Sequence, residues 1–288
     1  AGALLSLAAD DDIEKAIAQA GAIEPLIALV RTGESAGAKE SAAGALSNLA
    51  FDADNKKAIA QAGGIAPLIA LVRSGESAVA KENAAAALWN LAADADNKKA
   101  IAQAGGIPPL VELVRTGASA EAKANAAGAL WNLAADADNK KAIAEAGGIA
   151  PLVALVRTGE SAEAKANAAG ALWNLAVDAD NQKAIAEAGG IAPLVALVRT
   201  GESAQAKADA AGALKNLAAD ADNRKAISKA GGIAPLVALV RTGESAEAKA
   251  NAAGALWNLA VDADNQKAIA EAGGIAPLVA LVRTGESA

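Results

Sequence analysis

Asparagine recurs at one position of a repeated phrase, and its amide is the group in this chain best suited to recognising a ligand. The phrase Gly-Ala-Leu-Trp-Asn-Leu-Ala occupies 128–134, and its Asn returns every 42 residues. An Asn side chain offers two N–H donors and two acceptor lone pairs. A row of such amides matches the alternating N–H and C=O groups of an extended backbone. The alternative is that each amide forms a hydrogen bond that holds neighbouring third helices or loops in register. We call these residues the Asn row: Asn48, Asn90, Asn132, Asn174, Asn216 and Asn258.

Two further rows accompany the Asn row. The residue before each Asn forms the flank row: Ser47, Trp89, Trp131, Trp173, Lys215 and Trp257. The residue seven positions before each Asn forms the second polar row: Ser41, Asn83, Asn125, Asn167, Asp209 and Asn251. We predict a peptide-binding surface made of the Asn row and of both further rows without their two Ser members. For Trp, packing between repeats is favoured over ligand contact, and both interpretations stay open.

A helical wheel indicates where these rows point. With Leu172 set at 0° and about 100° per residue, Asn174 falls near 200°, Asn167 near 220° and Trp173 near 100°. Leu172 therefore marks a buried stripe, the two Asn residues mark an opposite polar stripe, and Trp173 lies on the flank between them. Stacked helices lie about 8–10 Å apart, and two extended residues span roughly 6.6–7.2 Å. Curvature would compress the helix spacing on the concave side toward the peptide value, so the geometry suits a peptide read at two residues per repeat.

The segment 138–146 is predicted to be a short helix. Its N-cap is Asp136 or Asp138, because a carboxylate accepts bonds from the free N–H groups of the first turn. Gly147 and Gly148 end the helix, because glycine adopts the left-handed conformation that follows many helices.

Two more helices complete the repeat. Pro151 suits the first turn of a second helix, and Arg157 lies at its C-terminal end, where a cation is favoured. Local pairing of Arg157 with Glu160 is the preferred role of that cation. After the break at 158–160, Ser161 caps a longer third helix that runs to about Val177.

The 42-residue period predicts an all-α solenoid of three-helix repeats. One such unit cannot bury its apolar face alone, so neighbouring units stack into a continuous core. We predict one elongated domain over 1–288. Its parts are a partial third helix at 1–11, full repeats at 12–53, 54–95, 96–137, 138–179, 180–221 and 222–263, and a partial repeat at 264–288.

Composition excludes several function classes. The chain has no His, Cys or Met, so the commonest general base, metal ligand and thiol nucleophile are missing. We predict no enzyme activity, no cofactor and no metal. The net charge of −7 disfavours nucleic acid, which is bound largely through basic contacts to phosphate. No apolar run approaches a membrane span and no signal peptide is visible, so we expect a soluble protein without a readable compartment, cytoplasmic in an expression host.

The repeated "DADN" segments could suggest Ca²⁺ ligands. An EF-hand loop needs a Gly and a distal Glu at fixed spacing, and neither is present, so helix capping is the preferred interpretation. Catalytic sites are singular constellations, whereas most Glu and Asp residues here repeat with the scaffold rather than forming a unique pair.

The sequence resembles the armadillo repeat family over essentially its whole length. The resemblance rests on the 42-residue unit, on "NKKAIAEAGGIAPLVALV" and on "AAGALWNLA". It implies a right-handed superhelix whose third helices line a concave groove. In importin-α-like members the equivalent of Asn174 bonds an extended, often basic, peptide, and a Trp four residues earlier stacks on its side chains. Here Gly170 occupies that position and Trp173 directly precedes the Asn, so the importin-type lysine pockets do not carry over.

The near identity of the repeats suggests design, and recent duplication is the alternative that could produce the same pattern. Repeats 138–179 and 180–221 differ at five positions: Lys140/Gln182, Glu163/Gln205, Asn167/Asp209, Trp173/Lys215 and Val177/Ala219. We expect a consensus-designed scaffold that binds extended peptides. The alternatives are a structural design without a ligand and a natural interaction module. The variant repeat is either a tuned pocket or a break in the Trp pattern for solubility. Both ends of 1–288 keep apolar residues, which predicts head-to-tail self-association; the alternative is that these residues are tolerated as imperfect caps.

Overall fold

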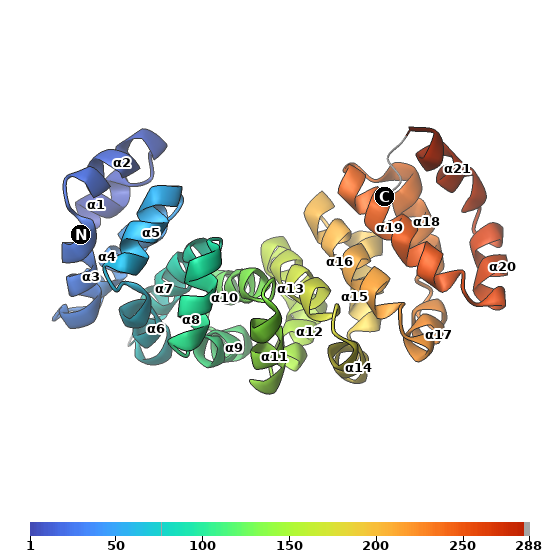
Figure 1. Cartoon of the computed structure of the whole chain (residues 1–288), viewed down its shortest axis with the longest axis horizontal. Coiled ribbons are helices and arrows are strands. Elements are labelled where there is room, and N and C mark those ends of the chain that lie inside the picture. Colours follow the sequence, from blue (N-terminus) through green and yellow to red (C-terminus); the bar gives the residue numbers. More distant parts are fainter. Residues whose placement is uncertain (76, 285–288) are drawn as a thin grey trace. The chain divides into compact units, whose positions relative to one another are not determined.

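The computed structural model describes residues 1–75 and 77–284, and these residues form 21 helices without a strand (Figure 1). Residues 285–288 of the predicted last repeat lie outside the described residues. Apart from α1 (Gly2–Leu7), the helices follow the expected order of short, short and long.

First helices are α2 (Asp11–Gln19), α5 (Ala53–Gln61), α8 (Ala95–Gln103), α11 (Ala137–Glu145), α14 (Ala179–Glu187), α17 (Ala221–Lys229) and α20 (Ala263–Glu271). Second helices are α3 (Ile23–Thr32), α6 (Ile65–Ser74), α9 (Ile107–Thr116), α12 (Ile149–Thr158), α15 (Ile191–Thr200), α18 (Ile233–Thr242) and α21 (Ile275–Thr284). Third helices are α4 (Ala36–Leu49), α7 (Ala78–Leu91), α10 (Ala120–Leu133), α13 (Ala162–Leu175), α16 (Ala204–Leu217) and α19 (Ala246–Leu259).

The first helix of each repeat is fixed at both ends by the residues expected to fix it. In α11 the Asp136 side chain accepts hydrogen bonds from the backbone N–H groups of Asp138 at 3.0 Å and Asn139 at 3.2 Å. Of the two candidate caps, Asp136 is therefore the N-cap. Gly147 follows the helix with a φ of +72°, a left-handed conformation that only glycine adopts without strain.

The second helix begins earlier than its proline. In α12, Pro151 is the third residue, where its missing N–H would have no partner inside the helix anyway. Arg157 lies in the last turn, as predicted. No ion pair joins it to Glu160, so that expected pairing is wrong. Its Nη2 donates to the carbonyl oxygen of Gly189 in the next repeat at 3.3 Å instead.

Each third helix begins at the predicted serine. In α13 the Ser161 hydroxyl accepts a bond from the N–H of Ala164 at 3.0 Å. The helix ends at Leu175, two residues before the expected end. It stops there because Asp178 must take a non-helical conformation, with ψ of 135°, to cap the next first helix.

The core lies between second and third helices. Leu88, Leu91, Leu130 and Leu133 are fully buried, as are the alanines that share their stripe. Because alanine is small, consecutive third helices pack directly against each other, as α13, α16 and α19 do, while the second helices pack behind them (Figure 1). The buried stripe of the helical wheel is thereby confirmed.

Two compact units divide the chain, Ala1–Gly147 and Gly148–Ala288. Each contains its own run of third helices packed side by side: α1, α4, α7 and α10 in the first unit, and α13, α16 and α19 in the second. The interpretation of 1–288 as one domain stays a prediction.

Candidate functional site

The Asn row joins consecutive third helices. The Nδ2 atom of Asn132 donates to the carbonyl oxygen of Trp89 at 3.1 Å, and that of Asn216 donates to Trp173 at 3.0 Å. Each acceptor is the flank-row residue of the preceding repeat. The same bond joins Asn48 to Leu5 (3.3 Å), Asn90 to Ser47 (3.0 Å) and Asn258 to Lys215 (2.9 Å). Asn174 occupies the same position on α13.

These bonds use part of each amide. The side chain of Asn132 is half-buried, and its Oδ1 accepts no hydrogen bond from the described residues. One of the two Nδ2 hydrogens is engaged, so a second donor and the carbonyl acceptor are left over. The bond to the preceding helix fixes the orientation of the amide, which reduces the entropy cost of a further interaction.

Tryptophan packs across the repeat boundary. A Cβ atom added to Gly128 would lie 2.5 Å from Cε2 of Trp89, and one added to Gly212 would lie 2.6 Å from Cδ2 of Trp173. Real Cβ atoms do not approach other atoms this closely, so both positions need glycine. The indole therefore covers the glycine of the next third helix, and both Trp89 and Trp173 stay half-buried.

Other side chains take the same place where Trp is absent. The Lys215 stem contacts the α19 glycine, since a Cβ added to Gly254 would lie 2.9 Å from both Cδ and Cε. In the first repeat Leu5 covers Gly44 in the same way, also at 2.9 Å.

Trp257 differs from the two packed indoles. Its side chain is 77% exposed, because among the described residues no third helix follows α19 to offer a glycine. Trp131 holds the equivalent position on α10, the last third helix of its unit.

The second polar row is also bonded between helices. Asn83 donates to the carbonyl of Glu40 at 3.0 Å, and Asn125 donates to Glu82 at 3.3 Å. Asn251 donates to Ala208 at 3.2 Å and is only 5% exposed. Asn167 occupies this position on α13. The row lies deeper than the wheel indicated, because the third helices approach closely enough to enclose it. Direct peptide contact by this row stays a prediction.

Asp209 places a carboxyl group where the neighbouring repeats have an amide. It is fully buried, and its Oδ1 accepts from Nε2 of Gln205 at 2.9 Å. Its Oδ2 has no hydrogen-bond partner among the described residues. Burial raises the pKa of Asp209 to about 7. The hydrogen bond from Gln205 lowers this pKa, and the negative charge of Glu247 raises it further. An ionised carboxylate cannot donate as Asn does, whereas the protonated acid can.

The repeats match a known family. The model of the armadillo/β-catenin-like repeat matches six times, at 10–51, 52–93, 94–135, 136–177, 178–219 and 220–261. The chain belongs to the armadillo repeat family. The family model begins each repeat two residues before the predicted boundaries, which places the N-cap Asp inside the repeat.

Solved structures of engineered proteins resemble these armadillo repeats. One engineered protein is 38% identical with a TM-score of 0.85, over 97% of this chain and 68% of that one. A designed armadillo repeat protein is 28% identical with a TM-score of 0.74, over 82% of this chain and 99% of that one. Another, in complex with the peptide (KR)4, is 25% identical with a TM-score of 0.70, with the same coverage of 82% and 99%. No curated protein matches the chain.

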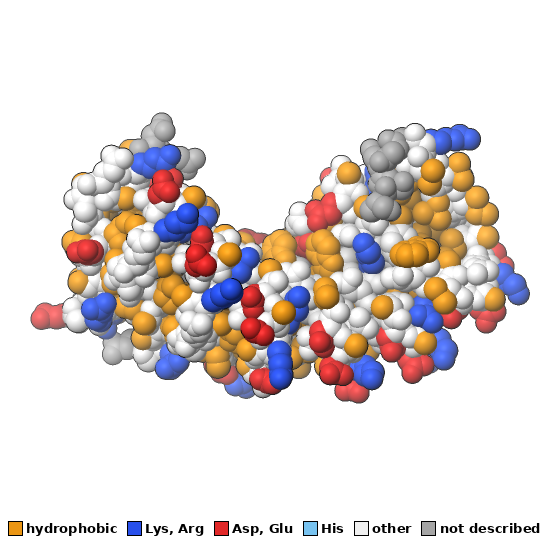
Figure 2. Space-filling model, viewed as in Figure 1, with side chains coloured by type: hydrophobic (Ala, Val, Ile, Leu, Met, Phe, Trp, Pro, Cys, Tyr) orange, Lys and Arg blue, Asp and Glu red, His pale blue; other side chains and the backbone are white. Residues whose placement is uncertain are grey.

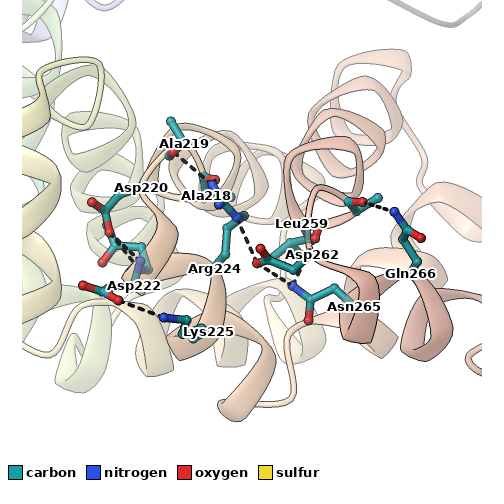
Figure 3. Close-up of polar contacts among 12 residues, drawn as sticks. Ala218, Ala219, Asp220, Asp222, Arg224, Lys225, Leu259, Asp262, Asn265 and Gln266 are labelled. Atoms are coloured by element: carbon teal, nitrogen blue, oxygen red, sulfur yellow. Dashed lines mark hydrogen bonds and ion pairs between the residues drawn. The ribbon is translucent and has the colours of Figure 1, made fainter.

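One contact between armadillo repeats was not foreseen in the sequence. Arg224 stands where the type repeat has Lys140, and its Nε lies 3.0 Å from Oδ2 of Asp262 (Figure 3). Its Nη1 also donates to the carbonyls of Ala218 at 3.4 Å and Ala219 at 3.2 Å. Engaged by Arg224, Asp262 makes no capping bond to α20, unlike the equivalent Asp residues of the preceding repeats. Only the substitution of Lys by Arg could have indicated this contact.

The described residues offer neither a metal site nor a membrane span. No group of three or more acidic residues lies close enough to hold a metal ion. No described helix has both the length and the apolar character needed to cross a bilayer. Figure 2 shows side chains of both charges interspersed over the visible face.

Proposed function

We propose that the chain is a designed, non-enzymatic armadillo scaffold that binds extended peptides through its Asn row. The surface in question, here called the third-helix surface, is the face of the third helices that carries the Asn row and the flank row. The observation that carries the proposal is the half-used amide. Asn132 is fixed by one donor and keeps an acceptor and a second donor, and Asn48, Asn216 and Asn258 also show a single bond. Asn90 differs, because its Nδ2 also reaches the Ser47 hydroxyl at 3.5 Å.

The flank row supports a peptide contact of a different kind. Trp89 and Trp173 each pack one part of the indole on a glycine and remain half-buried. A fixed aromatic side chain beside a backbone-binding amide offers apolar area at little entropy cost, which is why Trp is enriched at interfaces. We extend this role to Trp131 and Trp257.

The second polar row has a supporting role in the proposal. Its bonded members already join buried helix surfaces, so their contribution is to hold the third helices at the spacing that the Asn row needs. A ligand contact by Asn251 would require α16 and α19 to separate, because the residue is only 5% exposed.

The comparisons support a peptide ligand. A designed armadillo repeat protein that resembles this chain has been solved with the peptide (KR)4. For this chain, the net charge of −7 favours a peptide with basic residues.

The experiment compares two double variants on the same pair of helices. Asn132→Ala with Asn258→Ala removes two members of the Asn row. Asn125→Ala with Asn251→Ala is the matched control, because it removes the neighbouring bonds of the second polar row from α10 and α19. Both doubles should lose similar stability, about 1 kcal/mol per bond.

The first double variant should lose clearly more affinity for basic and neutral extended peptides in calorimetry than the control, which removes only bonds that support the helix spacing. Two lost bonds of about 1 kcal/mol each correspond to roughly 30-fold weaker binding. Equal losses of affinity in the two variants would show that the Asn row has only a structural role and does not contact the peptide. Failure of every peptide to bind at millimolar concentration would refute the function itself.

Self-association is a second candidate function, favoured by the apolar surface of the last helices. Figure 2 shows hydrophobic side chains gathered over the end formed by α18 to α21. The exposed large residues there are Trp257, Val261, Ile275, Val279 and Val282. We propose that helix α1 of a second copy packs against this surface. Gly2 of α1 is equivalent to the glycines that Trp89 and Trp173 cover in other repeats. A Cβ atom added to Gly2 would meet no atom closer than 3.9 Å, so its surface is open.

Light scattering tests this association. The apparent mass should rise with concentration, and Trp257→Ser should reduce the rise while leaving the helical signal unchanged. A strict monomer at high concentration would refute it.

A further inference from the structure

Lys215 is the only charged member of the flank row. It lies on α16 between the Trp173 and Trp257 positions of the adjacent third helices α13 and α19. Its Cδ and Cε atoms contact α19 at Gly254. When the apolar stem of a lysine lies along a helix, its strongly hydrated ammonium group stays at the water-facing end. The half-buried Lys215 therefore presents a cation on the third-helix surface.

The ammonium group of Lys215 has no acidic partner among the described residues. Asp209, on the same helix, is fully buried and bonded to Gln205. Glu247, on α19, is seven residues from Gly254, which is about 10 Å along a helix. The cation is thus available for an anion that arrives from outside.

A second substitution in the same repeat changes the surface charge in the same direction. Gln205 stands where other third helices expose a glutamate, such as Glu163 and Glu247. Relative to the type repeat, replacement of Glu163 by Gln205 removes a negative charge and replacement of Trp173 by Lys215 adds a positive one. At these two positions α16 therefore carries the cation Lys215 and no glutamate, between two helices that keep theirs.

We propose that Lys215 makes the α16 repeat selective for a peptide with an acidic side chain at that register. The inference rests on the proposed peptide binding. Alternate side chains of an extended peptide point to opposite sides. A peptide read at two residues per repeat along the Asn row therefore directs one side chain per repeat toward the third-helix surface. Basic side chains suit the repeats that expose Glu121, Glu163 and Glu247, whereas an acidic one suits Lys215. The ligand is a mainly basic extended peptide with one Glu or Asp.

The test uses three peptides of about six residues, two for each of the third helices α13, α16 and α19, that alternate Lys and Ala. They differ only at one central Lys position, which carries Glu, Gln or Lys. Calorimetry at low salt should rank Glu above Gln by about two- to fivefold, the range of an exposed ion pair. High salt should remove this preference. A spin label on the Glu peptide should broaden the amide signals of the described residues in a single register, with Glu next to α16.

Two variants locate the preference. Lys215→Gln removes the charge. Lys215→Trp also removes the charge and introduces the residue type of Trp173, which covers Gly212. The Trp variant should therefore keep the packing on Gly254. Both should bind the Glu and Gln peptides equally. If the Glu preference persists in both variants, or if the unchanged chain shows none, Lys215 is not the selective residue even though peptides bind. If none of the three peptides binds, the underlying peptide-binding function is refuted as well.

Discussion

Replacing Asp209 by Asn is the sharpest test of how the second polar row holds the third helices together. The neighbouring repeats show the intended bond, because Asn251 donates to Ala208 and Asn125 donates to Glu82 across the same type of interface. An ionised Asp209 leaves Oδ2 buried without a partner. Asp209→Asn restores a donor and removes a buried charge, so it should stabilise the protein whenever the acid would be ionised.

The size of the effect follows from proton linkage. The folded-state pKa of Asp209 is about 7, and an unfolded Asp titrates near 3.9. The folded state therefore holds its proton more tightly, and its stability falls as pH rises from about 4 to about 7. About three pKa units at 1.36 kcal/mol each correspond to roughly 4 kcal/mol. Asp209→Asn should thus be nearly neutral at pH 4 and stabilising by up to about 4 kcal/mol at pH 8.

Repeat proteins need a local measurement, because their unfolding is approximately a sum over repeats and interfaces. Hydrogen exchange of the α13 and α16 amides at pH 5 and pH 8, supported by urea denaturation, supplies it. Asn251→Asp is the reciprocal variant and should create the same pH dependence one repeat later. The reasoning fails if the stability gain of Asp209→Asn is the same at both pH values, since the buried carboxyl would then not titrate with folding.

Two further changes probe the repeat boundary and the helix caps. Gly212→Ala should cost about 1–3 kcal/mol of stability through overpacking against Trp173. Adding Trp173→Ala should recover part of the lost stability. Thermal denaturation that shows Gly212→Ala to be neutral would contradict the close approach. Asp178→Ala removes a side chain that accepts hydrogen bonds from the N–H groups of Asp180 and Asn181. It should cost about 1 kcal/mol in urea denaturation. The control is the isosteric Asp180→Asn, which alters no capping bond and should leave the midpoint unchanged.

The fold was predictable because each helix boundary depends on local chemistry. Asp136, Ser161 and Gly147 act within a few residues of their own position, so their roles can be read from the sequence. The 42-residue period then determines the architecture, since identical units must bury identical faces against each other. The error of two residues at the end of α13 arose because Val177 is apolar enough to continue the helix, while the next cap, Asp178, ends it.

The site was less predictable because its contacts cross repeats. A helical wheel gives the direction of Asn251 but not the distance to α16, and that distance decides whether an amide is exposed or enclosed. Arg157 presents the same difficulty: Glu160 is close in sequence, yet the carbonyl of Gly189 is the group within reach. Spacing within one repeat cannot reveal a partner that stands in the next.

The flank row shows which interrepeat contacts can nevertheless be read from a sequence. A large side chain in one repeat requires glycine four positions before the Asn of the next, as Trp89 with Gly128 and Trp173 with Gly212 demonstrate. Where the flank residue is the small Ser47, the next repeat has Ala86 at that position. The pairing follows from volume, because a Cβ and an indole cannot occupy the same space. Lys215 keeps its glycine, so that repeat retains the geometry of its neighbours and differs from them in surface charge.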